Sequence, residues 1–450
     1  MLPPSPPSTL YSPPHPSQTT LPEITRSTCL SYAQTRFPHA TIREAPHQGR
    51  CSYTLFLLFN NNKNNTILQF RPPRHALDLS ITAAAHLIFG ETLVPQTHFL
   101  GVINPRVTAA ANEPSSSPPC DDTAEEVGGT TMIMLIYTHT LVRGVPLSTF
   151  LTLRLQEAKG TPPSPPLEGV VRSLAQQYFI PSLRHSLPPS SARLPVLKRA
   201  VGWGMRRQAE RLLRGLPVRF RGVVGEVVAA MGEIEGWLPW GLTHGDFLGG
   251  GNVLVGFDGD EGGGGEGQEG KGEERLTGLV DWAEGEWLPF GVGLYGLEEV
   301  LGRTVTDGKG TRFEYYPDAE RLRAAFWEEM VAAVPELACG SREREVVEKA
   351  RLLGLLLWYG IAFDDGALNR VVQPGRDDEE LQKLDLFLLG VCHDIKTSPI
   401  PSEQSGNLDE WQTVAGPAAS HTQAQRWSEQ GLSYAEALKR KFVPGSCRPS

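Results

Sequence analysis

The first third of the chain alternates short apolar runs with polar connectors, a pattern that predicts a small sheet with one main helix. Apolar runs at residues 52–59 and 66–70 flank the polar stretch 60–65, which predicts a β-hairpin with a polar turn. The alanine-rich residues 77–89 predict a helix, and Gly90 directly after them suits a left-handed cap. The other elements expected here are a helix over residues 21–36 and strands over 99–103 and 132–137.

The apolar period becomes helical after Pro146 and stays so over most of the remaining chain. Two short β-type segments, residues 252–257 and 276–281, interrupt it and are expected to pair. The combination predicts an α+β protein in which a small, strand-rich part precedes a larger, mostly helical part. The helices expected in that second part cover residues 147–158, 166–179, 193–214, 219–235, 317–333, 343–362 and 377–393.

Segments rich in Pro, Ser, Gly or Glu mark the limits of the folded regions, because such segments bury little apolar surface. The domain limits that follow are a disordered N-terminus at 1–22, a first lobe at 23–145 with a flexible insertion at 113–128, a second lobe at 146–395 with a flexible Gly/Glu-rich loop at 258–274, and a largely disordered tail at 396–450.

Composition narrows the class of protein. Hydrophobic residues make up 40% of the 450-residue chain and charged residues 21%, which is typical of soluble globular proteins. The formal net charge of -9 argues against a nucleic-acid binder. A basic stretch at 198–221 is interpreted as a solvated helical face, and a site for an anionic partner stays open as the alternative.

The lack of a membrane-spanning run and of a secretory signal, together with the cysteine pattern, predicts a cytoplasmic protein. No apolar run reaches the length of about 18 residues needed to span a membrane, and residues 1–20 lack the pattern of a secretory signal. The six cysteines have no C-x-x-C pair, so the sequence predicts neither a zinc site nor a disulfide framework. The expectation is a cytoplasmic protein without membrane contact.

One ordered set of polar residues has the types and the order that a catalytic site would need. His244, Gly245 and Asp246 are followed by Asn252 at the start of one apolar strand, and Asp281 lies at the end of the next. Phosphoryl transfer needs a carboxylate near the acceptor hydroxyl and hard oxygen ligands for magnesium. In this scheme Asp246 accepts or orients the acceptor proton, His244 braces the loop, and Asn252 and Asp281 bind Mg2+.

The segment resembles the catalytic loop and metal-binding strand of the aminoglycoside phosphotransferase family and its choline and small-molecule kinase relatives. Those proteins carry His-Gly-Asp, then Asn, then an apolar strand that ends in Asp-Trp or Asp-Phe, as Asp281-Trp282 does here. The resemblance implies a two-lobed, protein-kinase-like fold, ATP and Mg2+ as cofactors, and a small-molecule hydroxyl as acceptor. The continuation 283–291 also looks like the family.

Two features depart from the family pattern. Asn252 follows Asp246 by six positions instead of five, with three glycines between them, and the expected Lys and Glu of the first lobe are not visible. The strand at residues 66–71 offers Gln69 or Arg71 instead, and Ser52 lies where a phosphate-covering loop is expected. Ser52, Gln69 and Arg71 are therefore the nucleotide-binding candidates, with Arg71 favoured because its guanidinium is forked and permanently charged.

Two functions stay open at this point. The first is a phosphotransferase that moves the ATP γ-phosphoryl group to a small-molecule hydroxyl. The second is a pseudokinase, or a nucleotide- or protein-binding module, with the same fold and little or no transfer. A hydrolase is excluded because the chain has no G-x-S-x-G or H-E-x-x-H motif. The acceptor and the oligomeric state are left open.

Overall fold

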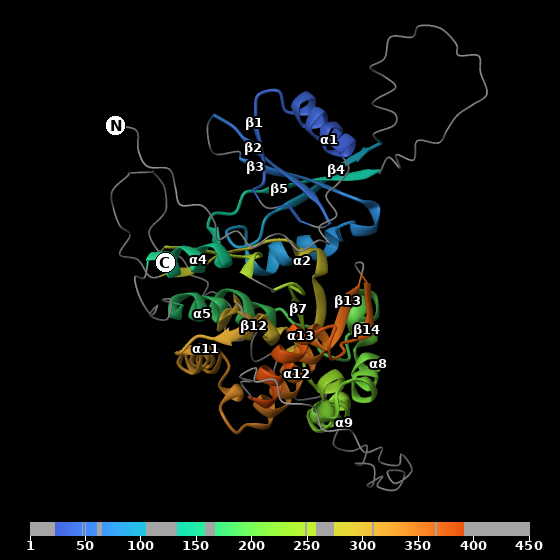
Figure 1. Cartoon of the computed structure of the whole chain (residues 1–450), viewed down its shortest axis with the longest axis vertical. Coiled ribbons are helices and arrows are strands. Elements are labelled where there is room, and N and C mark those ends of the chain that lie inside the picture. The colour runs from blue at the N-terminus through green and yellow to red at the C-terminus, as the bar shows by residue number, and fades with distance from the viewer. Residues whose placement is uncertain are drawn as a thin grey trace, which may run out of the picture. The chain divides into compact units, whose positions relative to one another are not determined.

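The computed structural model describes residues 23–46, 48–49, 51–60, 65–104, 133–157, 167–247, 250–257, 274–307, 310–364 and 367–390 (Figure 1). The predicted N-terminus at 1–22, the insertion at 113–128, nearly all of the loop at 258–274 and the tail at 396–450 lie outside these residues. The α+β class expected from the sequence is confirmed in its coarse form, with helices and small sheets in one chain.

Contacts divide the chain into two compact units. The first contains residues 1–145 together with 277–284, and the second contains 146–276 together with 285–450. Residues 277–284, which the sequence assigned to the helical part, therefore group with the first unit. Asp281 belongs to the first unit, whereas His244, Asp246 and Asn252 belong to the second.

The first unit is built on a five-stranded sheet with the order β1-β2-β3-β5-β4. Apolar residues from β2, β3 and β5 form its core with Cys29 and Ala33 of α1, so this helix covers one face of the sheet (Figure 1). The elements are α1 (Glu23–Arg36), β1 (Thr41–Glu44), β2 (Tyr53–Leu58), β3 (Thr66–Arg71), η1 (Pro73–His75), α2 (Leu79–Phe89), β4 (Thr97–Ile103), β5 (Met134–Thr140) and η5 (Trp282–Glu284).

The predicted hairpin is confirmed, because β2 and β3 pair antiparallel from Tyr53 opposite Phe70 to Leu57 opposite Thr66. Strand β1 was not expected, and three of its four residues are exposed, which leaves no apolar alternation to recognise. Gly90 does end α2, but its φ of 88° and ψ of 159° differ from the expected left-handed cap. The helix N-terminus is capped by Asp78, whose carboxylate accepts from the Ser80 and Ile81 amides.

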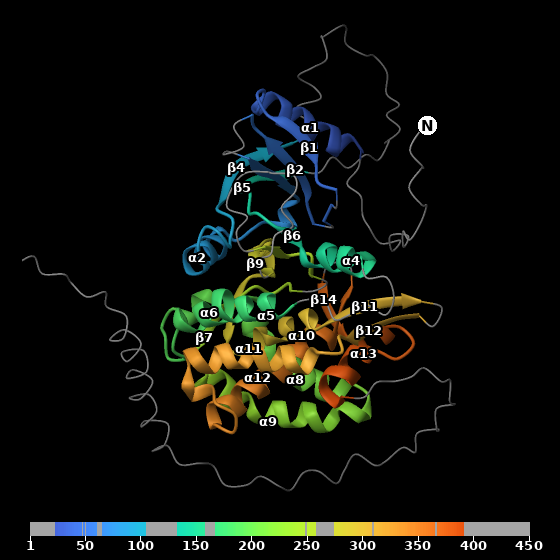
Figure 2. The same cartoon turned by 90° about the vertical axis from the view of Figure 1, so that its left-hand side faces the viewer.

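The second unit is mostly helical, and α12 lies at its centre against α8, α9, α10 and α13 (Figure 2). A Cβ at Gly354 of α12 would collide with the Val292 carbonyl, so glycine is what allows the backbones to approach there. The helices are α4 (Leu147–Glu157), α5 (Glu168–Leu174), the π-helix η2 (Ala175–Phe179), α6 (Ile180–Arg184), α7 (Leu194–Leu197), α8 (Ala200–Gly215), η3 (Val218–Phe220), α9 (Arg221–Trp237), η6 (Val292–Leu294), α10 (Tyr295–Val300), α11 (Ala319–Ala333), η7 (Pro335–Leu337), α12 (Arg342–Tyr359), α13 (Asp378–Leu384) and the π-helix η8 (Asp385–Leu389).

Short strands interrupt the helices from residue 145 onward. The expected pairing of the strands at 252–257 and 276–281 is confirmed in the sheet β6-β8-β9, while the pairs β7 with β10, β11 with β12 and β13 with β14 were not expected. The strands are β6 (Val145–Pro146), β7 (Trp240–Thr243), β8 (Val253–Phe257), β9 (Glu274–Leu279), β10 (Glu286–Pro289), β11 (Gly302–Asp307), β12 (Gly310–Tyr315), β13 (Ile361–Asp364) and β14 (Ala367–Val371).

Three predicted helices are wrong in their extent. The helix expected at 166–179 continues through α6 to Arg184. The helix expected at 343–362 ends at Tyr359, because strand β13 begins at Ile361. The helix expected at 193–214 is broken into α7 and α8, with Lys198 and Arg199 extended between them. No helix in the described part of the chain is both long and apolar enough to cross a membrane.

Candidate functional site

The loop that follows β7 is held in place by hydrogen bonds from three directions. The His244 amide donates to the Tyr178 hydroxyl at 2.8 Å, and the Asp246 amide donates to Nδ1 of His244 at 3.2 Å. The indole of Trp358 on α12 donates to the Gly245 carbonyl at 2.8 Å. His244 is fully buried, so its ring acts inside the loop as an acceptor for the backbone of Asp246.

Asn252 reaches Asp246 in spite of the additional residue between them. Its side-chain nitrogen donates to the Asp246 carboxylate oxygen Oδ2 at 2.9 Å and to the Asp246 main-chain carbonyl at 3.0 Å. Both amide hydrogens are thereby committed, and the carboxamide oxygen is the atom left to be offered to a cation. The structure thus brings together three of the predicted site residues: His244, Asp246 and Asn252.

Buried aromatic side chains lie directly under this loop. The rings of Tyr178 and His244 both pack against Phe247, with centroids 5.1 Å away in each case. Tyr295 accepts from the Phe247 amide at 3.4 Å and stacks on Trp358 at 4.2 Å. Burial raises the pKa of Tyr178 and of Tyr295 above that of an ordinary tyrosine, so both hydroxyls stay protonated and serve as fixed loop supports.

The strand partner of β7 is anchored by a buried carboxylate. Glu286 of β10 accepts backbone amides at the start of α8, from Arg199 at 2.5 Å, Val201 at 3.0 Å and Gly202 at 2.7 Å. Glu286 lies opposite Thr243, the residue before His244, in the β7–β10 pair. Burial raises the pKa of Glu286, and the three amide donors only partly offset that effect. Glu286 thus links the N-terminus of α8 to the strand that leads into the loop.

A second group of predicted site residues lies within the first unit. The Arg71 guanidinium contacts the Asp281 carboxylate with Nη2 2.6 Å from Oδ1, and its Nε donates to Oε1 of Gln69 at 2.7 Å. The amide nitrogen of Gln69 in turn donates to the Ser52 hydroxyl at 3.2 Å. Ser52, Gln69, Arg71 and Asp281 therefore form one continuous hydrogen-bonded chain.

Asp281 has an unusual backbone conformation. Its φ of 57° is in the left-handed region, which non-glycine residues seldom adopt. The next residue fixes this turn, because Trp282 stacks on Phe89 of α2 with ring centroids 5.2 Å apart and donates its indole N–H to the Leu279 carbonyl. The Asp281 side chain is 39% exposed, whereas that of Arg71 is 2% exposed.

The donor chemistry of these residues fits magnesium. Asn252 offers a carboxamide oxygen and Asp281 a carboxylate, which are the hard oxygen ligands that Mg2+ prefers. No cluster of three or more His, Cys, Asp or Glu side chains occurs within the described ranges.

Some residues of the site were missed by the sequence patterns. Tyr178, Tyr295 and Trp358 contact the loop from positions far away in sequence, and a period of apolar residues predicts burial without predicting this contact. Glu286 gave a weak signal, because it is a charged residue directly before the apolar pair Trp287-Leu288. The helix α2 contains no acidic residue, in agreement with the absence noted in the sequence.

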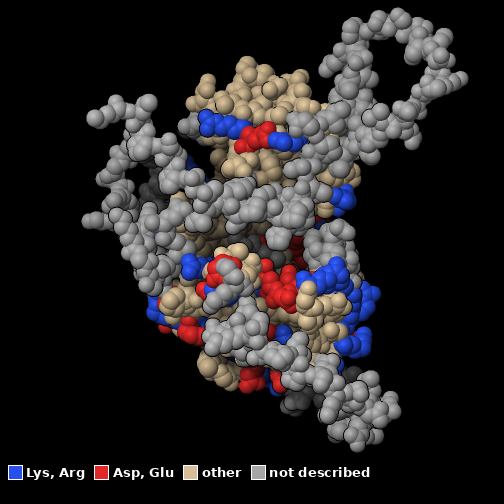
Figure 3. Space-filling model, viewed as in Figure 1, with Lys and Arg blue, Asp and Glu red and all other residues tan. Residues whose placement is uncertain are grey.

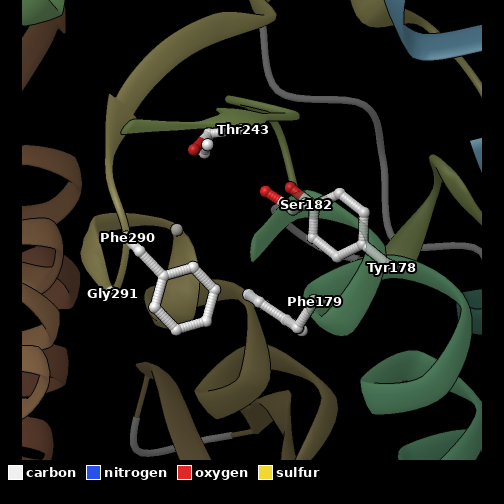
Figure 4. Close-up of a pocket in the computed structure, with 8 residues that line it drawn as sticks. Tyr178, Phe179, Ser182, Thr243, Phe290 and Gly291 are labelled. Carbon is white, nitrogen blue, oxygen red and sulfur yellow. The ribbon is translucent and has the colours of Figure 1, made fainter. Parts of the chain in front are cut away.

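The one cavity described near this loop is too small for a substrate. It lies behind β7 and measures about 10 Å³, which is room for a single water molecule at most. Figure 4 shows its wall, with the rings of Tyr178 and Phe290 and the side chains of Ser182 and Thr243. The acceptor cannot bind there.

The basic stretch at 198–221 maps mainly to α8. Lys and Arg side chains gather over this helix in the space-filling view (Figure 3), and Arg206, Arg207 and Arg214 are exposed. Arg206 forms an ion pair with Glu235 at 2.5 Å, and Arg219 forms one with Asp385 at 2.6 Å. This pattern agrees with the interpretation of a solvated helical face.

Comparison with known proteins gives matches only among solved structures. No protein family and no curated protein matches the sequence. An ethanolamine kinase from Plasmodium vivax is similar with a TM-score of 0.37 and 8% identity, over 73% of this chain and 78% of that one. A microcompartment-associated aminopropanol kinase is similar with a TM-score of 0.32 and 12% identity, over 73% and 96%. Similarity this slight does not establish activity, so the proposal below relies on the chain's own residues.

Proposed function

We propose that this protein is a phosphotransferase that moves the γ-phosphoryl group of ATP to a hydroxyl group of a small molecule. The observation that carries the proposal is the pair formed by Asp246 and Asn252, in which one carboxamide donates to both the carboxylate and the carbonyl of Asp246. This bond holds the carboxylate in a fixed direction, which is what a group that receives a proton from an acceptor requires.

Each residue has a proposed role. The acceptor oxygen forms a bond to the γ-phosphorus while the bond to the ADP oxygen breaks, and the acceptor's proton passes to the Asp246 carboxylate. Asn252 and Asp281 are the proposed Mg2+ ligands, and Ser52, Gln69 and Arg71 the proposed nucleotide contacts. Magnesium, when bound, supplies positive charge that neutralises the phosphate oxygens.

Two residues that do not react, His244 and Trp358, are proposed to hold the loop that contains Asp246. His244 accepts the Asp246 amide and Trp358 donates to the Gly245 carbonyl, so the loop keeps its shape without a ligand. A loop that needs no reorganisation presents its carboxylate at little entropic cost when the acceptor binds.

A second function is favoured by one specific observation. The helix α2 has no carboxylate, and the Arg71 guanidinium contacts Asp281, one of the proposed metal ligands. Under this alternative the protein is a pseudokinase or a nucleotide- or protein-binding module that transfers little or no phosphate.

One experiment separates the two functions. The full-length chain is incubated with labelled ATP, Mg2+ and a panel of amino alcohols, polyols and sugars, and phosphorylated product is measured beside a thermal-shift titration with ATP. The phosphotransferase predicts product from at least one acceptor and a loss of about 10²–10⁴-fold in Asp246→Asn with an unchanged melting temperature. The control Asp378→Asn removes an exposed carboxylate in the same unit and should keep the wild-type rate.

The opposite results are equally clear. If Asp246→Asn turns over as fast as the wild type, Asp246 does not receive the proton. If ATP raises the melting temperature and no acceptor is phosphorylated, the binding module is the better description.

A further inference from the structure

Arg71 is a buried cation with a single carboxylate partner in the described part of the chain. Its side chain is 2% exposed, and Asp281 is the acid within ion-pair distance. A buried charge without a counter-charge is strongly unfavourable, so the guanidinium depends on this partner. The neighbouring helix α2 contains no Asp or Glu that could take its place.

The position of the guanidinium is fixed from the opposite side. Oε1 of Gln69 accepts the Arg71 Nε–H at 2.7 Å, and the Gln69 amide is held by the hydroxyls of Ser52 at 3.2 Å and Thr54 at 3.5 Å. A longer contact of 3.5 Å links Nη1 to the His75 carbonyl. Because the fork of Arg71 is held on both sides, its charge stays beside Asp281.

The carboxylate itself is only partly used by this contact. Nη2 of Arg71 lies 2.6 Å from Oδ1, while the side chain of Asp281 remains 39% exposed. A cation could therefore still reach the carboxylate, but it would do so next to a permanent positive charge. Two like charges that share one carboxylate repel each other, and partial burial weakens the screening between them.

We propose that Arg71 is a built-in counter-ion of Asp281 that lowers the affinity of this carboxylate for a divalent cation. The proposal rests on the proposed function in one respect, the role of Asp281 as a metal ligand. Arg71 balances the charge of the Asp281 carboxylate without metal, and it sets the metal affinity through its own charge. On this view Arg71 determines the metal affinity of Asp281 in addition to its proposed contact with the nucleotide.

The metal affinity is measured with Mn2+ as the probe, from the electron paramagnetic resonance signal of the free ion in titrations of the full-length chain without nucleotide. Arg71→Gln should bind Mn2+ about tenfold or more tightly than the wild type, because the repelling charge is gone and a neutral donor remains. Arg71→Lys keeps the charge and should stay within about threefold of the wild type. Arg74→Gln removes an exposed arginine three positions further along, and its Mn2+ affinity should also stay within about threefold of the wild type.

Protein stability gives a second measurement that does not need metal. Asp281→Asn leaves the buried guanidinium without its counter-ion and should lower the melting temperature by about 5 °C. Arg71→Gln should lower it less, because water can solvate the exposed carboxylate. The double variant should melt above Asp281→Asn, and simple additivity of the two effects would contradict the counter-ion role.

The outcomes separate this inference from the proposed function. Equal Mn2+ affinity in the wild type and Arg71→Gln overturns the counter-ion role and leaves the phosphotransferase untouched. Absence of Mn2+ binding in every variant, with and without ATP, overturns both the inference and the metal role of Asp281. Tighter binding in Arg71→Gln alone, with Arg71→Lys and Arg74→Gln unchanged, supports the proposal.

Discussion

Asn252 donates its side-chain amide to two atoms of Asp246, the carboxylate oxygen Oδ2 at 2.9 Å and the main-chain carbonyl at 3.0 Å. The pair closes a loop that contains one residue more than the family pattern has. The Asn252 side chain donates to the carboxylate and to the main-chain carbonyl of the same residue. It therefore fixes the orientation of the Asp246 carboxylate relative to the Asp246 backbone.

Asn252→Ala should therefore destabilise the protein by about 1–2 kcal/mol, since two acceptors lose their donor. Asn252→Asp keeps the size of the side chain but places a second carboxylate against Oδ2, so it should cost more than the alanine variant. Urea unfolding of both variants measures the difference. An aspartate variant as stable as the alanine variant would show that Oδ2 of Asp246 does not face this position.

The glycines of the same loop should respond unequally to substitution. Gly250 has a φ of 66°, and a Cβ there would lie 3.2 Å from the Ser148 amide nitrogen, whereas a Cβ at Gly251 would meet no atom within 4 Å. Gly250→Ala should cost about 1–2 kcal/mol through backbone strain, and Gly251→Ala should be close to neutral. Thermal unfolding of the two variants checks this, and equal melting temperatures would contradict the loop conformation.

This loop also shows what the sequence could and could not predict. The order His244, Asp246, Asn252 indicated one loop, because residue types at that spacing suit one chemistry. The six-residue spacing raised a question that composition could not answer, namely whether Asn252 still reaches Asp246. In the structure Asn252 does reach Asp246, and Gly250 in the same loop has a positive φ, which is a property of the folded backbone.

The strands that frame the loop were missed for a physical reason. All four residues of β7 and all four of β10 are buried, so neither strand shows the alternation of a half-buried strand. The break between α7 and α8 has a similar origin, because the carboxylate that accepts the first amides of α8 comes from Glu286, 87 positions after Arg199. Contacts between residues so far apart in the sequence cannot be predicted from local patterns in a single sequence.

The hairpin β11–β12 was missed although a local signal exists. In the sequence, Gly308 and Lys309 separate Gly302–Asp307 from Gly310–Tyr315, and a glycine-containing pair between two β-type runs is a hairpin signal. The residues of β11 are mostly polar and only Gly302 is buried, which resembles a surface loop more than a strand.

Two glutamates that share Arg323 provide a matched test of buried charge. Glu298 and Glu320 both contact this guanidinium, at 2.7 Å and 2.6 Å, but their side chains are 2% and 92% exposed. Glu298 also accepts from Arg351 at 3.1 Å and from the Tyr315 hydroxyl at 2.7 Å. Glu298→Gln should thus cost about 1.5–3 kcal/mol, because a buried carboxylate that accepts from two arginines and a tyrosine loses its charge, although Arg323 keeps Glu320 and Arg351 keeps Glu348.

Glu320→Gln removes an exposed partner of the same arginine and should change the unfolding free energy by less than about 0.5 kcal/mol. Denaturant unfolding of both variants at one pH gives the comparison. If the two substitutions cost the same, burial does not decide the strength of these ion pairs.

His139 on β5 should make the stability of the protein depend on pH. Burial lowers its pKa to about 4, and the positive charge of Arg71 acts in the same direction. Its Nδ1 lies 3.0 Å from the Thr97 hydroxyl, and its Nε2 is buried without a hydrogen-bond partner among the described residues. The ring is therefore neutral in the folded protein at pH 7.

The direction of the effect follows from this lowered pKa. Between the ordinary pKa of 6.5 and about 4, the unfolded chain binds a proton that the folded chain does not, so stability falls as the pH falls through this range. From pH 7 to pH 5 the histidine should account for a loss of about 2 kcal/mol. His139→Asn can keep the contact to Thr97 and cannot take up the proton, so its unfolding free energy should fall by that much less over the same range.

Unfolding free energies of the wild type, His139→Asn and the control His98→Asn are measured at several pH values from 7 to 5. His98 is exposed on the neighbouring strand β4 and is the weakest of the groups that act on the His139 pKa, so its substitution should change the slope far less than His139→Asn does. A His139→Asn variant with the wild-type slope would mean that His139 is hydrated or paired in the folded state. A slope reduced in this variant alone would place the proton-linked step at the β4–β5 pair, beside the strand that carries Arg71.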